Sequence, residues 1–397
     1  MRIILIGDAP GIQQLLRHIT NEVVVGIVGA SIRTHYLEEL QKIADKMAVP
    51  LLIQPKWRSE DYEVFVKKLT DLSPDLIWVN SYSMIIRDDV LSIPRLGAIN
   101  IHGAQLPRNR GCNPIQWAII KREHKTGVTL HSIDSGLDTG PIIAQETVDI
   151  KMNDSWLDVR NKIEKATDVL INDSLNQILS GNWKAISQDE QMATLGARRK
   201  AEDGFFEWSE PAIDIYNKIR ALLPPIPPAY FINATGEKVF MTELQPLWKL
   251  LSLKAAQFSN ELLKGQDVLL LPRSCLTIDD WNFRFVLFSE QKKVLLDVDS
   301  SDTNHLCFEI KKASSYEIIG VGILTNINWP EGEAELVLAS AQEHNLSGNA
   351  PWLEAAKLIS EIGFEEFLFK RIYIRIGEVN RCTKANLANN GLKVLFH

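Results

Sequence analysis

The sequence has few cysteines, no long apolar run and no excess of positive charge. Its 397 residues include four scattered cysteines, Cys112, Cys275, Cys307 and Cys382, which form neither a CxxC pair nor the ligand spacing of a metal site. No apolar run approaches the roughly 20 residues that cross a membrane. The N-terminus MRIILIGDAPG is typical of a strand and a turn rather than of a signal peptide. We therefore expect a cytoplasmic protein with reduced thiols, no bound metal and no membrane segment.

Acidic residues outnumber basic ones: 50 Asp and Glu against 43 Lys and Arg give a formal net charge of −7. Nucleic-acid binding normally needs a basic surface, so this balance argues against a nucleic-acid partner, although a local patch stays open. Hydrophobic residues make up 45% of the chain and charged residues 23%, the composition of an ordinary folded protein. The length exceeds that of a usual single domain, so we expect two or three domains.

Short apolar segments alternate with amphipathic segments in the N-terminal part of the chain. Apolar runs predict strands at 2–6, 22–28, 49–53 and 75–80. Helical patterns occupy 12–19, 34–47 and 60–72. This alternation predicts an α/β fold with a mostly parallel sheet, whose ligands bind at the carboxyl ends of the strands. The segments 80–86 and 100–103 both follow such ends, so we expect them to face one crevice.

The residues best suited to catalysis lie between Ile99 and Gly140. Asn100 and His102 follow an apolar strand signal, and residues i and i+2 of an extended chain share a face. A hydrogen-bond donor beside a group that titrates near neutral pH suits acyl transfer, which needs oxyanion stabilisation and proton transfer. From residue types alone, a turn cap at Asn100 and a packed His102 explain the pair about equally well. His131, on an alternating strand nearby, is more typical of a structural residue.

This segment resembles the folate-dependent formyltransferases. The family motif, roughly N-[IV]-H-x-S-L-L-P-x-[YW]-R-G followed by G-x-D-[TS]-G, corresponds here to NIHGAQLPRNRG and GLDTG, and the connecting PIQWAI and TGVTL are similar. The family's catalytic Asn, His and Asp fall on Asn100, His102 and Asp138. The resemblance implies an enzyme that takes its formyl group from 10-formyltetrahydrofolate and has a mostly parallel, Rossmann-like sheet.

The resemblance also implies where two small-molecule substrates bind. The loop SYSMII corresponds to the family's loop that grips the folate pterin. Folate contacts are therefore expected at Met84, Ile85, Ile86, Asp134 and Gly136. The turn after His102 borders the acceptor in the family. Acceptor contacts are therefore expected at Asn109, Arg110, Asn113 and Trp117. Ordinary solvated loops stay an open alternative, and the family's usual aromatic residue is replaced by Asn109, which leaves the acceptor's identity open.

The C-terminal third of the chain has a different pattern. RRKAEDGFFEW at 198–208 resembles the end of the catalytic domain in sugar and methionyl-tRNA formyltransferases. We therefore expect a catalytic domain at 1–200, a short formyltransferase C-terminal subdomain or linker at 201–250, and another domain at 251–397. The last one resembles the GNAT acyltransferases over roughly 264–397, which implies an α+β fold. Its equivalent of the family's pyrophosphate-binding turn, 345–350, lacks the leading Gln or Arg, and Leu387 replaces the Tyr general acid, so binding of CoA is in doubt.

The acceptor is predicted by elimination. The negative net charge and the altered C-terminal part argue against methionyl-tRNA as the acceptor. A glycinamide ribonucleotide formyltransferase would end near residue 200, so the length of the chain argues against that enzyme. We expect an N-formyltransferase acting on a nucleotide-linked amino sugar for polysaccharide biosynthesis. Because GNAT enzymes acetylate UDP-4-amino-4,6-dideoxy sugars in pseudaminic-acid-type pathways, that sugar is favoured over a dTDP-amino sugar.

Three alternatives stay open at this point. The first is a methionyl-tRNA formyltransferase. The second is a bifunctional protein whose GNAT-like half is an acetyltransferase, and the third is one whose GNAT-like half only binds the sugar nucleotide. A homodimer is also open, and the sequence does not decide the nucleotide, the sugar stereochemistry or the position of the formylated amine.

Overall fold

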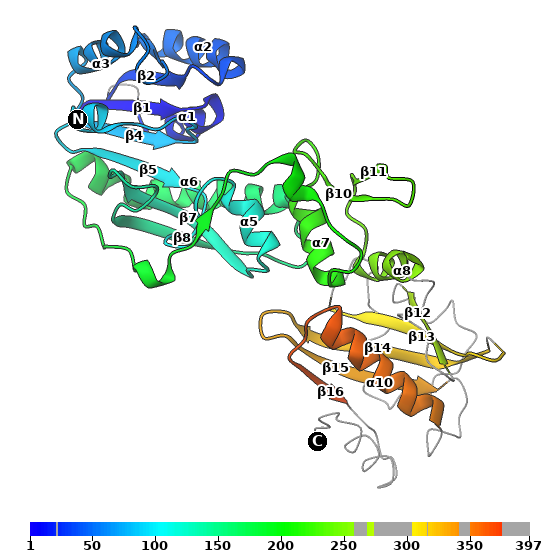
Figure 1. Cartoon of the computed structure of the whole chain (residues 1–397). Coiled ribbons are helices and arrows are strands. Elements are labelled where there is room, and N and C mark those ends of the chain that lie inside the picture. Colours follow the sequence, from blue (N-terminus) through cyan, green and yellow to red (C-terminus); the bar gives the residue numbers. More distant parts are fainter. Residues whose placement is uncertain (21–22, 258–267, 274–303, 316, 341–349, 375–397) are drawn as a thin grey trace. The chain divides into compact units, whose positions relative to one another are not determined.

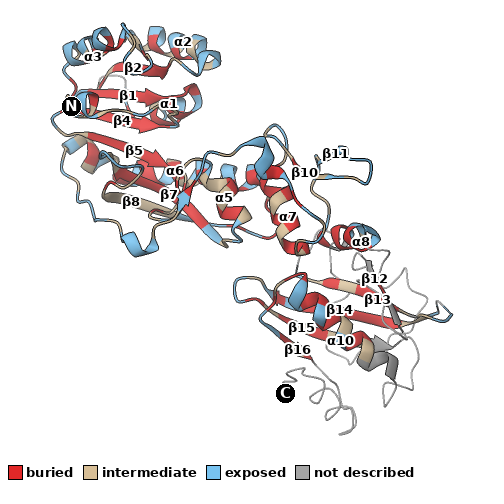
Figure 2. Cartoon of the chain, viewed as in Figure 1, coloured by how far each residue is buried: buried red, intermediate tan, exposed pale blue. Residues whose placement is uncertain are grey.

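The computed structural model describes residues 1–20, 23–257, 268–273, 304–315, 317–340 and 350–374. The chain forms two compact units (Figure 1). One unit comprises Met1–Ile150 and Trp156–Arg199, and the other comprises Lys151–Ser155 and Lys200–His397. Each unit contains its own sheet, and buried residues run along the strands of both sheets (Figure 2).

The first unit is built on a seven-stranded sheet with the order β3-β2-β1-β4-β5-β7-β8. Its strands are β1 (Ile3–Gly7), β2 (Val24–Ala30), β3 (Leu51–Gln54), β4 (Leu76–Asn80), β5 (Ala98–His102), β7 (Lys125–Ser132) and β8 (Ile142–Asp149). The pairs from β3 across to β5 are parallel, whereas β7 runs antiparallel to β5 and β8 antiparallel to β7. The predicted α/β fold with a mostly parallel sheet is confirmed.

Helices cover this sheet and bury its central strands. They are α1 (Ala9–Leu16), α2 (Leu37–Met47), α3 (Tyr62–Asp71), α4 (Asp88–Leu91), α5 (Pro114–Ile120) and α6 (Trp156–Ser180). Helices α1, α2 and α3 pack on β1, β2 and β3, and α6 packs on β7 and β8. Every residue of β1 and β4 is buried, which explains why both strands are continuous apolar runs.

The first helix begins earlier than the sequence pattern indicates. We expected a turn at GDAPG and a helix from Ile12, but α1 starts at Ala9 and includes the proline. Proline is tolerated in the first turn of a helix because the N–H that it lacks has no intrahelical partner there. Asp8 therefore stands at the carboxyl end of β1 as the residue before the helix.

The second unit begins with a helical and hairpin region. Its elements are α7 (Ala212–Ala221), β10 (Ala229–Ile232), β11 (Lys238–Met241) and α8 (Leu247–Gln257), and β10 pairs antiparallel with β11. An aromatic cluster joins this hairpin to the chain that precedes α7. Phe206, Trp208 and Phe231 lie with ring centroids 5.1–5.6 Å apart, and Phe206 is fully buried.

A five-stranded sheet follows in the order β12-β13-β14-β15-β16. Its elements are β12 (Val268–Arg273), β13 (Leu306–Lys312), β14 (Ile318–Asn328), β15 (Glu333–Ser340), α10 (Ala350–Glu365) and β16 (Arg371–Ile374). The first four strands are antiparallel neighbours, whereas β16 returns parallel to β15 after α10, which packs on the sheet (Figure 1). The likeness to GNAT proteins stays a prediction. Residues 345–349 and Leu387, on which its CoA site depends, lie outside the described residues.

Residues from distant parts of the chain hold both ends of α7. The backbone N–H groups of Ala212 and Ile213 donate to the side chain and the carbonyl of Glu366, at 2.8 and 3.0 Å. Glu366 also forms a buried ion pair with Lys254 of α8, at 2.5 Å. At the other end, Arg220 Nη1 donates to the carbonyl oxygens of Lys151 and Asp154, at 2.9 and 2.8 Å. These contacts lie within the second unit.

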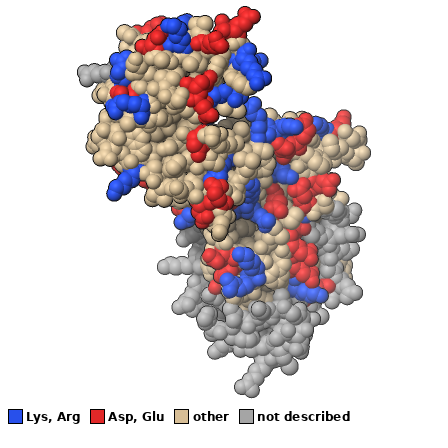
Figure 3. All heavy atoms as spheres, turned by 60° about the vertical axis from the view of Figure 1, so that its left-hand side comes forward, with Lys and Arg blue, Asp and Glu red and all other residues tan. Residues whose placement is uncertain are grey.

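Three further observations concern the surface and the thiols. No described helix is both long and apolar enough to cross a lipid bilayer. On the face drawn in Figure 3, basic and acidic side chains lie interspersed.

Cys112 is a free thiol, as expected, but Cys307 is disulfide-bonded, so the expectation of reduced thiols is wrong at that position. The other two cysteines lie outside the described residues.

Candidate active site

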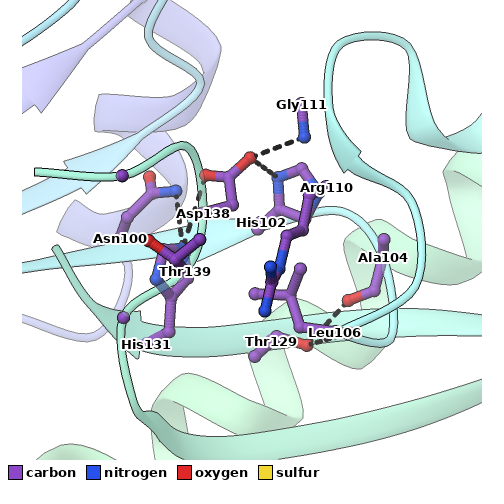
Figure 4. A network of polar contacts seen from close by, with 12 residues as sticks. Asn100, His102, Ala104, Leu106, Arg110, Gly111, Thr129, His131, Asp138 and Thr139 are labelled. Atoms are coloured by element: carbon purple, nitrogen blue, oxygen red, sulfur yellow. Dashed lines mark hydrogen bonds and ion pairs between the residues drawn. The ribbon is translucent and has the colours of Figure 1, made fainter. Parts of the chain in front are cut away.

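Strand β5 and the loop between β7 and β8 bring the three predicted catalytic residues together. Asn100 and His102 occupy alternate positions of β5, as the i, i+2 spacing predicts, and Asp138 comes from the GLDTG loop. Nδ1 of His102 lies 3.5 Å from Oδ2 of Asp138. Figure 4 shows the three side chains pointing toward one another. Their catalytic role stays a prediction at this point.

The protonation pattern of His102 follows from its hydrogen-bond partners. Nε2 of this buried ring lies 2.9 Å from the backbone oxygen of Asn109, and a carbonyl oxygen can only accept, so Nε2 carries the hydrogen. In the neutral ring Nδ1 is then unprotonated, and it is the nitrogen that faces Asp138. Proton uptake at Nδ1 produces an imidazolium beside a carboxylate. The site can therefore hold a proton at a defined atom.

The residue that orients His102 is itself tightly held. Asn109 is 1% exposed, has a φ of +53°, and donates through its side-chain amide to both carboxylate oxygens of Glu123, at 3.1 and 2.9 Å. Its backbone N–H donates to Oγ1 of Thr194 at 2.8 Å. Burial raises the pKa of Glu123. Asn109 was expected to contact the acceptor, and that contact stays a prediction.

His131 orients Asn100. Nδ1 of His131 donates to the carbonyl oxygen of Ser132 at 2.8 Å, so Nε2 accepts from the side-chain amide of Asn100 at 3.1 Å. Burial lowers the pKa of His131 below its usual value, which keeps this ring neutral and Nε2 an acceptor at neutral pH. An amide nitrogen carries two hydrogens, so the second one on Asn100 is available to a ligand.

The loop that carries Asp138 is compact and strained. Asp138 has a φ of +54°, a conformation that residues other than glycine rarely adopt, and its Oδ2 accepts from the backbone N–H of Gly111 at 2.8 Å. Asp134 accepts from the N–H of Gly136 at 3.0 Å and from the hydroxyl of Thr139 at 2.6 Å. Asp134 and Gly136, expected at the folate, thus shape the loop that carries Asp138, and their contact with folate stays a prediction.

The loop expected to grip the pterin follows β4 and is fixed by Gln54. The carbonyl of Ile85 accepts from Nε2 of Gln54 at 3.0 Å, while Oε1 of the same side chain accepts from the hydroxyl of Tyr82 at 2.8 Å. The side chain of Ile85 is 73% exposed, whereas Ile86 packs against the core. The sulfur of Met84 lies 3.8 Å from the hydroxyl of Ser31. This geometry leaves backbone groups and one exposed apolar side chain to meet a ligand.

The remaining predicted acceptor residues contact the segment 188–199. The guanidinium of Arg110 donates to Gln188 and Glu190, the side chain of Asn113 accepts from the N–H of Arg199 at 3.1 Å, and Nε1 of Trp117 donates to the carbonyl of Ala197 at 2.8 Å. A short parallel pairing of β6 (Arg110–Gly111) with β9 (Leu195–Gly196) joins the two stretches. The acceptor role of these residues stays a prediction.

Sequence reasoning did not single out Glu123, Gln188, Glu190 or Thr129. Thr129 donates to the carbonyl of Ala104 at 2.7 Å and accepts from the N–H of Leu106 at 3.1 Å, which holds the turn after His102 (Figure 4). Thr129 lies in the TGVTL segment, whereas the other three lie in no motif quoted above, and each of the four acts through a contact distant in sequence. Within the described residues, no group of three or more His, Cys, Asp or Glu side chains is placed to hold a metal ion.

Two segments of the chain match models of known families. Residues 1–175 match the formyl transferase family model, and residues 198–258 match the model for the formyl transferase C-terminal domain. The two matched segments correspond to the two domains of a formyltransferase. The prediction of a formyltransferase enzyme is confirmed.

One solved structure shares the fold of the formyltransferase part, and two others resemble this chain less closely. A sugar N-formyltransferase from a Shewanella species is 19% identical with a TM-score of 0.51, and the match covers 62% of this chain and 97% of that one. A 4-N formyltransferase from Francisella tularensis is 20% identical with a TM-score of 0.49, covering 62% and 98%. An N-formyltransferase from Helicobacter canadensis, in complex with folinic acid and dTDP-3-aminofucose, is 18% identical with a TM-score of 0.43, covering 56% and 80%.

Proposed function

We propose that this protein transfers the formyl group of 10-formyltetrahydrofolate to the amino group of a nucleotide-linked amino sugar. The observation that carries the proposal is the cluster of Asn100, His102 and Asp138, in which Nδ1 of the histidine lies 3.5 Å from the carboxylate. The two formyltransferase domains support the reaction. The folate is a co-substrate in this proposal.

In the reaction, the amine nitrogen bonds to the formyl carbon, the bond from that carbon to the folate nitrogen breaks, and a proton passes from the amine to the folate nitrogen. The formyl oxygen carries negative charge in between. The second N–H of Asn100 and a protonated Nδ1 of His102 would stabilise that charge. Removing one such donor typically lowers kcat by about 10²–10³-fold.

Asp138 contributes to the mechanism because its carboxylate is held opposite Nδ1 of His102. Its Oδ2 is held by Gly111 N–H at 2.8 Å and faces His102 Nδ1, while its Oδ1 lies 3.7 Å from Nε2 of His131. The carboxylate therefore lies opposite the nitrogen of His102 that would hold a proton while charge develops on the substrate. It would also accept a proton from the amine, directly or through one water.

The amino-sugar acceptor and its details belong to the proposal. An amino sugar is favoured by the acidic net charge, by the change in the chain after residue 250 and by the shared fold with a sugar N-formyltransferase. Within that class, we propose a UDP-4-amino-4,6-dideoxy sugar of a pseudaminic-acid-type pathway, with a dTDP-amino sugar second. The cytoplasmic location and the homodimer stay predictions.

We also propose that the C-terminal part is GNAT-like, with domains at 1–200, 201–250 and 251–397. The order of four antiparallel strands, a helix and a parallel fifth strand supports it. Because this part lacks the expected leading Gln or Arg and the Tyr acid, we assign it no acetyl transfer. Titration of the full chain with CoA tests this: saturable binding with acetylation of an amino sugar would contradict it.

An acceptor panel tests the main proposal. The full-length protein is incubated with 10-formyltetrahydrofolate and, separately, UDP-amino sugars, dTDP-amino sugars and methionyl-tRNA, and products are identified by mass. We expect a formylated sugar nucleotide, formed at least about 100-fold more slowly by an Asp138→Asn protein. Formylation of methionyl-tRNA alone, or a sugar product formed only with acetyl-CoA, would overturn the assignment.

A further inference from the structure

Gln188 connects two parts of the active site that are distant in sequence. Its Oε1 accepts from Nε and Nη2 of Arg110, at 3.0 and 2.8 Å. Its Nε2 donates to the carbonyl oxygens of Asp138 and Gly140, at 2.8 and 2.7 Å. A single half-buried carboxamide thus makes four hydrogen bonds, two to each part.

The chemistry of its neighbours fixes the orientation of this carboxamide. A guanidinium has only donors, so the end of Gln188 that faces Arg110 must be the oxygen. The other end is then the NH₂ group, and it faces two backbone carbonyls, which only accept. A rotation of the amide by 180° would place donor against donor and acceptor against acceptor. The side chain therefore has one satisfied orientation.

Arg110 is held in turn by a second residue of the same segment. Its Nη1 and Nη2 donate to the two carboxylate oxygens of Glu190, at 2.9 and 2.7 Å, and its side chain is 8% exposed. The backbone N–H of Arg110 donates to the carbonyl of Thr194 at 2.9 Å. Four guanidinium hydrogen bonds therefore fix the group that orients Gln188.

Asp138 requires support from outside its own loop. Its φ of +54° lies in the left-handed region, where a residue with a side chain is strained and stays only if surrounding contacts hold it. Gly111 N–H holds the carboxylate, and Gln188 holds the carbonyl of the same residue and that of Gly140. The carboxylate and the backbone of Asp138 are thus fixed separately.

We propose that Gln188 is a positioning residue for formyl transfer, whose carboxamide locks the backbone from Asp138 to Gly140 so that the carboxylate stays opposite His102. This inference rests on the proposed function and deepens it. In this role Gln188 acts through Asp138, whose carbonyl oxygen it contacts at 2.8 Å. A positioning role predicts a lower kcat, whereas a substrate-binding role predicts a higher KM, so steady-state kinetics distinguish the two.

A double-mutant cycle tests the proposal. Gln188→Met keeps the volume of the side chain and removes all four hydrogen bonds. We expect kcat to fall by about 10- to 100-fold, because a displacement of about 1 Å at a reacting group can cost about 100-fold. KM for the folate should change by less than about threefold, since the substitution removes no contact of the residues expected to bind the folate. In an Asp138→Asn background the same substitution should cost less than about twofold, because the residue that it positions no longer acts.

The controls keep the test independent of folding. Gln191→Met changes an exposed glutamine of the same segment and should leave kcat unchanged. Gln188→Glu keeps the contact with Arg110 but places a carboxylate oxygen, which only accepts, against two carbonyl oxygens. It should therefore lower kcat as much as Gln188→Met does. This second variant tests the proposal even if Gln188→Met folds poorly. A raised KM with unchanged kcat, or an equal cost in the Asp138→Asn background, would overturn the inference. If the unsubstituted protein formylates no acceptor, that result contradicts the proposed function itself, and not only the role of Gln188.

Discussion

The side-chain amide of Asn100 donates to a neutral ring nitrogen of His131, at 3.1 Å. The contact links β5 to β7, in which these two residues are direct register partners. It matters because an unrestrained carboxamide could present either its oxygen or its nitrogen to a substrate. With His131 fixed by Ser132, the amide nitrogen faces the site, and the candidate oxyanion donor is set before any ligand arrives.

Acidification should weaken the fold through His131. Burial lowers the pKa of His131 below its usual 6.5, so the unfolded chain takes up this proton more readily than the folded chain. Its contribution to stability is therefore full above pH 6.5 and is lost as the pH falls toward the folded-state pKa. His131→Gln keeps an acceptor but does not titrate. We expect denaturant unfolding at about pH 7.5 and about pH 5.5 to show a smaller pH-dependent loss in this variant, and an equal loss would contradict the assignment.

Substitution of His102 or Asp138 should separate binding from chemistry. His102→Asn removes the group that holds the proton, and Asp138→Asn removes the facing charge. Each should lower kcat by at least about 10²-fold, while equilibrium titration still detects folate binding. His35→Asn, at an exposed histidine of the same unit, should behave like the unsubstituted protein. Turnover at the normal rate in the His102→Asn protein would refute its role.

The loop that carries Asp138 should not tolerate a side chain at Gly140. A Cβ at this position would lie 1.8 Å from the carbonyl oxygen of Ser132, a backbone atom that cannot move aside. Gly140→Ala should therefore displace the loop and lower kcat by more than about tenfold. Gly103→Ala is the matched substitution, because its Cβ would meet only ordinary contacts at 4.0 Å, and thermal unfolding should find it nearly as stable as the parent. Full activity in Gly140→Ala would show that the loop adapts.

The buried ion pair of Lys254 and Glu366 should be costly to break on one side only. Their side chains are 4% and 7% exposed, so Glu366→Ala leaves a buried charge without its partner and should destabilise the fold by about 3–5 kcal/mol. Lys254→Met combined with Glu366→Gln should recover part of that loss. The exposed pair of Lys67 and Asp71 provides the comparison, and Asp71→Asn should cost less than about 0.5 kcal/mol. Equal effects in urea unfolding would contradict this account.

Local patterns predicted most of the elements that build the sheet. The apolar runs at 2–6 and 75–80 correspond to β1 (Ile3–Gly7) and β4 (Leu76–Asn80), because buried parallel strands need continuous apolar sequence. The i, i+2 spacing also placed Asn100 and His102 on one face, since side chains of a strand alternate. Helix α1 was misjudged because a proline in its first turn has the appearance of a loop.

Contacts distant in sequence could not be predicted in this way. Gln188 meets Asp138 across 50 residues, and its segment lacks a periodic pattern that would place it there. The bond between Asn100 and His131 depends on the antiparallel register of β5 and β7, which one strand alone does not encode. The resemblance to formyltransferases supplied the candidate residues, whereas the residues that hold them in place became visible only in three dimensions.

The cap on helix α7 has a consequence for how this protein is made. Ala212 lies in the segment matched to the formyl transferase C-terminal domain, yet its N–H is satisfied by Glu366, 154 residues later. A ribosome adds about 5–20 residues per second, so this helix stays uncapped for roughly 8–30 s after its own residues are joined. A shorter gene product that stopped after the matched domains would also leave Lys254 without its counter-charge. The cap of α7 thus forms only after Glu366 has been translated.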